Sequence, residues 1–301
     1  MSTAAPPLDD PTALAQFGRL EVVARLLVEG YLLGQHKSPF KGTSVEFVEH
    51  RQYTPGDELR HIDWRAYAKT GEYYVKQFEE ETNLRAYLLV DVSGSMAYAG
   101  STLSKLNYAK TAAAALAYLL LTQRDACGLV TFADRVLDRR EPKSQQATFP
   151  ELAQLLEARP ASREGRIGAV LSELLPSLKR RSLVWLLTDG FDDPNALAET
   201  LKQFRAHGHD LVFLQISAPE EETFPFRRPT LFRDLEAPVQ HRPVDPLQLR
   251  RSYLERYQSF CETLQRNCTA AGVDHVKLVT NEPYHRALGT YLAYRTQRAG
   301  R

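Results

Sequence analysis

The stretch that most constrains this chain is an apolar run, residues 86–90, that ends abruptly in Asp91 and is followed by Ser93 and Ser95. The run predicts a buried strand, and a helical segment follows over about 104–123. The three polar side chains are therefore expected at the carboxyl end of a sheet, where open α/β sheets place their binding sites. A carboxylate and two hydroxyls are hard oxygen ligands that suit Mg²⁺. The pattern therefore predicts a metal-assisted binding site before it predicts an enzyme.

Composition excludes several other classes of function. Of 301 residues, 38 are Lys or Arg and 37 are Asp or Glu, so the net charge is close to zero. The chain therefore lacks the excess of positive charge that is typical of proteins that bind nucleic acid or an anionic membrane. The three cysteines form neither a disulfide framework nor a Cys-x-x-Cys metal pair. Residues 1–10 lack the basic start and apolar core of a signal peptide, and the longest apolar stretch, residues 112–121, is too short to insert in a membrane. We expect a cytoplasmic protein.

From residue 84 onward, predicted strands and helices alternate. The strands are expected at 84–90, 126–132, 183–188, 210–216 and 274–279, and the helices near 104–123, 148–158, 166–179, 194–207, 246–271 and 283–296. Such alternation predicts an α/β fold with a mostly parallel, doubly wound sheet covered by helices. The polar stretch 133–147 and the Pro-rich stretch 219–246 are expected to be irregular connections.

The region before the first predicted strand differs in character. Residues 12–33 have the apolar spacing of an amphipathic helix. Residues 36–80 are rich in charged and aromatic side chains, with short strands expected at 45–48 and 73–78. Because so many aromatics cannot be buried by so short a segment, it is expected to pack on the main domain. The predicted organisation is a disordered tail at 1–11, an N-terminal helix and small β-rich elaboration at 12–83, the main domain at 84–296 and a tail at 297–301.

Two groups of motifs carry a resemblance to known families. Asp91, Ser93 and Ser95, with a later strand ending in Thr188-Asp189-Gly190, resemble the von Willebrand factor A fold of Rossmann type. The metal-ion-dependent adhesion site of that fold uses an Asp and two Ser from a first loop, a Thr from a second and an Asp from a third. The resemblance implies that Asp91, Ser93, Ser95 and Asp189 are the metal ligands.

The lead-in narrows this resemblance. Residues 42–47, 51–64 and 74–81 are similar to the signature of the domain-of-unknown-function 58 family, whose members often accompany MoxR-type AAA+ ATPases. The resemblance covers roughly residues 20–295. Five signature side chains form either an internal ion-pair network, which we favour, or a partner-docking surface: Arg51, Asp57, Arg60, Asp63 and Trp64.

One departure from the family pattern concerns the second loop. Gly165 stands where the resemblance implies a Thr ligand, and Arg166 stands where an acid is common. One hydroxyl ligand is therefore lost, and a permanent cation is placed beside the site. A guanidinium can pair bidentately with a carboxylate. We therefore hypothesise weak or absent Mg²⁺ binding, with Arg166 as a surrogate cation paired with Asp91 or Asp189, unless its side chain points to solvent.

Two interpretations of the protein remain open at this point. The favoured one is a non-enzymatic protein-interaction module with a partly degenerate metal-ion-dependent adhesion site. The resemblance implies an adaptor that works with a MoxR-type ATPase and a carboxylate-bearing client. The alternative is a divalent-metal-dependent hydrolase or phosphotransferase using Asp91 as nucleophile, against which Ser93 argues, since it stands where such an enzyme needs a second Asp. No motif supplies a nucleophile–base pair or a nucleotide-binding loop. Asp91, Ser93, Ser95 and Asp189 could also be plain helix caps.

Overall fold

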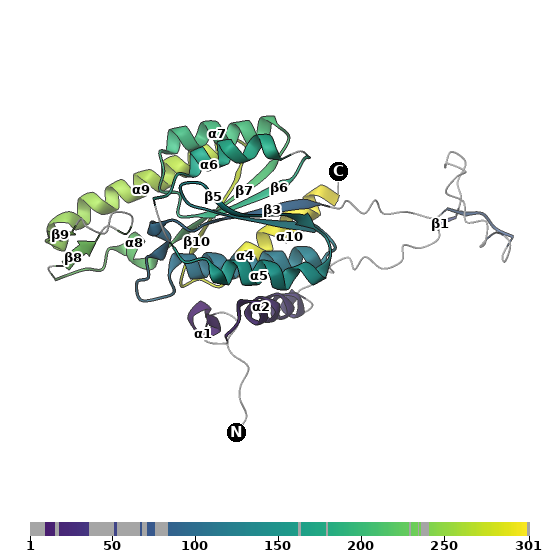
Figure 1. Cartoon of the computed structure of the whole chain (residues 1–301), viewed down its shortest axis with the longest axis horizontal. Coiled ribbons are helices and arrows are strands. Elements are labelled where there is room, and N and C mark those ends of the chain that lie inside the picture. The colour runs from purple at the N-terminus through teal and green to yellow at the C-terminus, as the bar shows by residue number, and fades with distance from the viewer. Residues whose placement is uncertain are drawn as a thin grey trace, which may run out of the picture. The chain divides into compact units, whose positions relative to one another are not determined.

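The computed structural model describes residues 10–15, 18–35, 51–52, 67, 71–75, 84–161, 164–178, 180–228, 230–233, 235 and 241–299. The chain divides into two compact units, one formed by residues 1–31 and 84–301 and the other by residues 32–83. Figure 1 shows the elements of the larger unit, in which a twisted sheet lies between two layers of helices.

The described part of the smaller unit includes a short antiparallel pair of strands. β1 (Arg51–Gln52) pairs with β2 (Tyr74–Val75), and the rings of Tyr67 and Tyr73 stack with centroids 4.4 Å apart. β2 falls inside the strand predicted at 73–78. The strand predicted at 45–48 lies outside the described residues, as do four members of the family signature: Asp57, Arg60, Asp63 and Trp64. That this segment packs on the main domain stays a prediction.

The central sheet of the larger unit has the strand order β10-β7-β6-β3-β4-β5. Its strands are β3 (Arg85–Asp91), β4 (Ala126–Phe132), β5 (Val136–Lys143), β6 (Leu183–Thr188), β7 (Asp210–Ser217) and β10 (Asp274–Val279). Neighbouring strands are parallel except β5, which runs antiparallel to β4 at one edge. The chain moves outward from β3 to β5 and then returns to β6 on the other side of β3. The predicted doubly wound sheet is thus confirmed, and its switch point lies between β3 and β6.

Helices cover both faces of this sheet (Figure 1). One layer contains α4 (Lys105–Thr122), α5 (Phe149–Ala158) and α10 (His285–Ala299), and the other contains α6 (Ile167–Leu174), α7 (Pro194–Ala206) and α9 (Pro246–Ala270). α4 is buried along almost its whole length, because β3, β4 and β6 pack on one side and α5 and α10 on the other. Buried Leu, Val and Phe side chains of α6, α7 and α9 form the opposite core with β3, β6 and β7. Among the described residues, no helix is both long and apolar enough to cross a bilayer.

The N-terminal helix prediction needs a correction, because two helices stand where one was expected. α1 (Pro11–Ala15) and α2 (Leu20–Gln35) are separated near Gly18, whose φ of +93° is left-handed and cannot continue a helix. The Asp10 carboxylate accepts hydrogen bonds from the backbone N–H groups of Thr12 and Ala13, so helix begins inside the segment expected to be a tail.

Four further boundaries differ from the sequence prediction. β5 was expected to be an irregular connection, because its half-exposed, charged residues lack the apolar pattern of an inner strand. α6 ends early, in a 3₁₀ turn over Leu175–Ser177 that contains Pro176. The stretch 219–246 contains α8 (Pro219–Thr223) and a hairpin of β8 (Thr230–Arg233) and β9 (His241–Val244). α10 extends to Ala299, into the expected C-terminal tail.

Candidate functional site

The candidate site lies at the carboxyl ends of β3 and β6, on the switch point of the sheet. These strands are parallel neighbours, with Val90 opposite Leu187. Asp91, at the end of β3, and Asp189, directly after β6, therefore lie at the same edge, as the sequence predicted. Both are buried, with exposed fractions of 1% and 3%. In doubly wound sheets this crevice is where ligands bind.

Local hydrogen bonds hold the Asp91 carboxylate in place. Its Oδ1 accepts the backbone N–H of Ser93 at 2.8 Å, and its Oδ2 accepts the Thr188 hydroxyl at 2.6 Å. The hydroxyl oxygens of Ser93 and Ser95 lie 3.1 Å apart. Ser93 is buried, whereas Ser95 is half-buried. The first loop thus presents one carboxylate and two hydroxyls together, and Ser95 brings the cluster toward the surface.

The surroundings of the Asp91 carboxyl disfavour its ionised form. Burial, followed by repulsion from Asp189, raises its pKa to about 7, although the hydrogen bonds from Thr188 and Ser93 act in the opposite direction. A second anion beside a buried carboxylate disfavours ionisation, whereas a cation placed near both would favour it. The pair therefore has the electrostatic character of a cation site.

A cation already contacts one of the two carboxylates, and it comes from α4. The Lys105 ammonium lies 2.8 Å from Asp189 Oδ2 and 2.6 Å from Glu221 Oε1, with the Lys105 side chain only 1% exposed. Burial alone would lower the pKa of Lys105, but Asp189 and Glu221 raise it above the ordinary lysine value. A buried ammonium with two carboxylate partners remains charged. The ion triad links α4, the loop after β6 and α8.

The hypothesis that Arg166 is a surrogate cation is wrong. Its guanidinium lies 3.8 Å from the Glu164 carboxylate, and its side chain is 65% exposed, so it points to solvent. Only its backbone is tied to the site edge, through a hydrogen bond from its N–H to the Ala133 carbonyl just beyond β4. Arg166 is the residue before α6, and its side chain makes no capping hydrogen bond there. The cation that pairs with Asp189 is Lys105 and not Arg166.

The side chains present fit a hard divalent cation with few protein ligands. Asp91, Ser93 and Ser95 supply a carboxylate and two hydroxyls, whereas Asp189 is engaged by Lys105 and Gly165 has no side chain to offer. Within the described ranges, no three His, Cys, Asp or Glu side chains form a metal cage. Mg²⁺ retains several waters and needs only one or two carboxylates. That Asp91, Ser93, Ser95 and Asp189 bind a metal stays a prediction.

Three residues of the site were missed by sequence reasoning: Thr188, Lys105 and Glu221. Thr188 could have been found, since it is the last residue of a strand that was expected to end at the same sheet edge as Asp91. Lys105 also carried a signal, because a lysine in the first turn opposes the helix macrodipole and often has an acidic partner. Glu221 offered none, since it lies 116 residues from Lys105 in the chain.

Comparison with curated proteins finds relatives of the whole chain. An uncharacterized protein of Mycobacterium tuberculosis and one of Mycobacterium bovis are each 24% identical over 296 residues, covering 97% of this chain and 92% of the relative. Their names record no activity.

Comparison with solved structures finds remote similarities. The conserved hypothetical protein BatB from Bacteroides thetaiotaomicron is 17% identical with a TM-score of 0.49, covering 71% of this chain and 99% of that protein. The SpRpn10 VWA domain is 11% identical with a TM-score of 0.41, covering 69% and 95%.

The family is established by a model match over more than two thirds of the chain. Residues 49–259 match the family described as "Protein of unknown function DUF58". The matched range includes the whole candidate site, from Asp91 to Glu221, and the sheet around it is the doubly wound, mostly parallel sheet expected from the sequence. The chain therefore belongs to the DUF58 family of proteins of unknown function.

Proposed function

We propose that this protein is a non-enzymatic interaction module that binds a partner protein at the edge formed by Asp91, Ser93, Ser95 and Asp189. The observation that carries the proposal is the convergence of these side chains at the switch point of the sheet. Family resemblance supplies the partner: a MoxR-type AAA+ ATPase, to which the module presents a carboxylate-bearing client. Ser95 is the accessible member of the set and forms the contact point for the partner.

The geometry speaks against Asp91 as a catalytic nucleophile. Its carboxylate is 1% exposed, and each of its two oxygens already accepts a hydrogen bond. A nucleophile must approach the reacting atom of its substrate, and it is normally activated by a base within hydrogen-bond reach. The Ser93 and Ser95 hydroxyls contact each other. The interaction module therefore remains the better proposal than a hydrolase or phosphotransferase.

Divalent cation binding is the second part of this proposal. Asp91, Ser93 and Ser95 would hold Mg²⁺ weakly, because Gly165 adds no ligand and Lys105 occupies Asp189. A bound cation would offer an open coordination position to a carboxylate of the partner. Without it, the burial and mutual repulsion of Asp91 and Asp189 make the edge unfavourable for a second anion. Client binding is therefore expected to rise with Mg²⁺ concentration in the millimolar range.

Binding of the purified MoxR-type ATPase from the same organism tests the proposal. Biolayer interferometry with and without Mg²⁺ would compare wild type with Ser95→Arg, which blocks the edge. We expect affinity to fall about tenfold or more in Ser95→Arg. Lys202→Glu is the control, because Lys202 lies on the solvent-exposed face of α7 and pairs with Glu199 on the same helix. No measurable binding, or equal binding by Ser95→Arg and wild type, would refute the proposed function.

A generic phosphoester screen tests the alternative. Mg²⁺-dependent turnover by the wild-type protein that disappears in Asp91→Asn would favour the enzyme. We expect no such turnover.

A further inference from the structure

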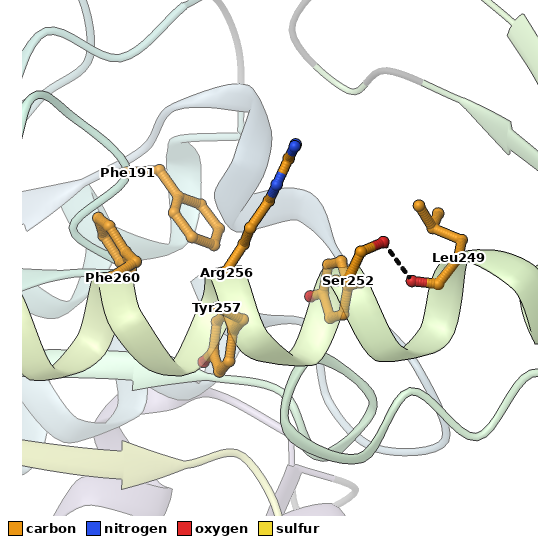
Figure 2. A pocket seen from close by; sticks show the side chains of 7 residues that line it. Phe191, Leu249, Ser252, Arg256, Tyr257 and Phe260 are labelled. Atoms are coloured by element: carbon orange, nitrogen blue, oxygen red, sulfur yellow. Dashed lines mark hydrogen bonds between the residues drawn. The ribbon is translucent and has the colours of Figure 1, made fainter.

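An aromatic groove lies beside the candidate site, between α9 and the loop that follows β6. Its volume is about 290 Å³. Its lining includes four aromatic side chains, Phe191, Tyr253, Tyr257 and Phe260, together with Leu249 and Arg256. Figure 2 shows Phe191 and Phe260 close together at one end, Leu249 at the other, and Arg256 extending away from the helix beside the Phe191 ring.

The walls of this groove are held by contacts with one another. The Phe191 and Phe260 ring centroids are 5.4 Å apart, and the stacked rings of Tyr253 and Tyr257 are 6.0 Å apart. Tyr253 also packs on Phe224, with a centroid distance of 4.7 Å. Phe191 is nevertheless 42% exposed. A preformed apolar surface of this kind binds a ligand with little loss of side-chain entropy.

Arg256 gives the groove an available positive charge. It is exposed and forms neither a hydrogen bond nor an ion pair with any residue of the described ranges, whereas Arg251 on the same helix pairs with Glu255 at 2.9 Å. A guanidinium next to aromatic rings suits a carboxylate that adjoins an apolar side chain. A purely apolar ligand would leave this cation unused, and a purely acidic one would leave the aromatic walls uncovered.

Phe191 connects the groove with the candidate site. It is the second residue after Asp189, and its ring centroid is 4.8 Å from the Lys105 ammonium, which pairs with Asp189. The ring therefore has one side on the buried ion triad and forms part of the groove wall. A chain segment that lies in the groove passes directly beside the loop that carries Asp189.

We propose that this groove binds an acidic segment of a partner protein, with an aromatic side chain against Phe191 and Phe260 and a neighbouring carboxylate on Arg256. The inference rests on the proposed interaction function and names the chemistry of the partner segment. The groove thus offers a carboxylate a binding position that requires no metal, because the cation there is the Arg256 side chain.

Isothermal titration calorimetry with a synthetic peptide tests this proposal. The probe is the capped heptapeptide Gly-Ser-Glu-Phe-Glu-Ser-Gly, titrated into the full-length protein in the presence of EDTA. We expect a dissociation constant of about 0.1–1 mM, about tenfold weaker binding when the peptide Phe becomes Ala, and a similar loss when both Glu become Lys. Replacing the Arg256 charge in Arg256→Glu should weaken binding about tenfold or more.

Matched variants separate the groove from general electrostatics and from the edge site. Arg251→Glu makes the same charge change on the same helix outside the groove, and it should keep binding within about twofold. Thermal melts of both variants test whether the fold is intact. We expect wild-type melting temperatures, since both side chains are exposed. No peptide binding up to the solubility limit, or equal losses in Arg256→Glu and Arg251→Glu, overturns the proposal.

Measuring the binding of both the peptide and the ATPase to wild type and to Ser95→Arg distinguishes a failure of the groove assignment from a failure of the proposed function. If the peptide binds but the ATPase binds neither wild type nor variant, the groove assignment stands and the proposed function fails. If the ATPase binds at the Ser95 edge but the peptide does not bind, the groove assignment fails and the proposed function stands.

Discussion

Replacing Lys105 by Met should destabilise the protein and make its stability depend on Mg²⁺. The substitution keeps a long unbranched side chain but removes the ammonium that lies within 2.8 Å of both Asp189 and Glu221. Two buried or nearly buried carboxylates are then left facing each other without a cation. The first expected consequence is a loss of folding free energy, because unpaired buried charge is costly.

The magnitude follows from the burial of the triad. Lys105 is 1% exposed, and its partners are 3% and 12% exposed, so solvent screens the interaction little. Removing one partner of a buried ion pair costs about 3–5 kcal/mol. For a chain of this size, about 2–4 °C of melting temperature is lost per kcal/mol, which gives an expected decrease of roughly 6–20 °C.

Thermal melts with Mg²⁺ or with EDTA provide the assay. A divalent cation that binds the folded Lys105→Met protein at 100 times its dissociation constant restores about 2.7 kcal/mol. With a dissociation constant of about 0.1 mM for the variant, we therefore expect 10 mM Mg²⁺ to recover from about half to about nine-tenths of the lost stability. The same addition should raise the melting temperature of the wild type less than that of the variant, because Lys105 already neutralises part of the site.

Lys110→Met is the matched control on the same helix. Lys110 is also buried, but its ammonium bonds to the Arg159 carbonyl oxygen instead of to the candidate site. The control should lose stability without gaining a response to Mg²⁺. A Lys105→Met protein as stable as wild type, or a wild-type response to Mg²⁺ as large as that of the variant, would refute the reasoning.

Three further predictions concern the same region of the sheet. Thr188→Val removes the hydroxyl that bonds to Asp91 and should lower the free energy of unfolding by about 1–3 kcal/mol in urea titrations; an unchanged urea midpoint would contradict the bond. Gly190→Ala should be more destabilising than Gly208→Ala, because both glycines have φ near +80° but only at Gly190 does an added Cβ meet a side chain, at 2.9 Å; equal melting temperatures would show that the close approach is absent. Burial acts to raise the pKa of Asp210, but hydrogen bonds from a tyrosine and two arginines hold it below its ordinary value. Asp210 therefore stabilises the fold at a pH above about 4 and loses this effect as the pH falls through its folded pKa, so Asp210→Asn should reduce the acid-induced loss of stability between about pH 5 and 2. Parallel stability–pH curves for wild type and Asp210→Asn would rule this out.

The strands of the site could be predicted because their signal is local. β4 and β6 have the predicted bounds, since each is a short apolar run closed by polar residues and buried on both faces. The meeting of Asp91 and Asp189 follows from the alternation of strands and helices, because parallel strands bring their carboxyl ends to one edge. β5 was missed because an edge strand pairs on one side only and tolerates charged residues such as Asp138 and Arg139.

The charge pairing of the site could not be predicted in the same way. Arg166 and Lys105 are both cations placed near the site by the chain, and sequence spacing favoured Arg166 because it lies in the second loop. Which cation enters the cleft depends on side-chain direction at a helix start: Arg166 projects to solvent, whereas Lys105 projects from the first turn of buried α4 toward the sheet edge. Its second partner, Glu221, comes from a helix inside a stretch predicted to be irregular.

The balance of charge in the cluster bears on how a client carboxylate is recognised. Three carboxylates, Asp91, Asp189 and Glu221, accompany a single ammonium, so the cluster keeps negative charge even when Asp91 is protonated. An incoming carboxylate is repelled at this edge unless a divalent cation intervenes. At Arg256 it meets an available guanidinium without any metal. The proposed module therefore has two binding positions for acidic groups, the edge at Ser95, which requires a metal, and the groove at Arg256, which does not. Phe191 lies between them. A client whose binding persists in EDTA but is lost in Arg256→Glu uses the groove, whereas one that requires Mg²⁺ and is lost in Ser95→Arg uses the edge.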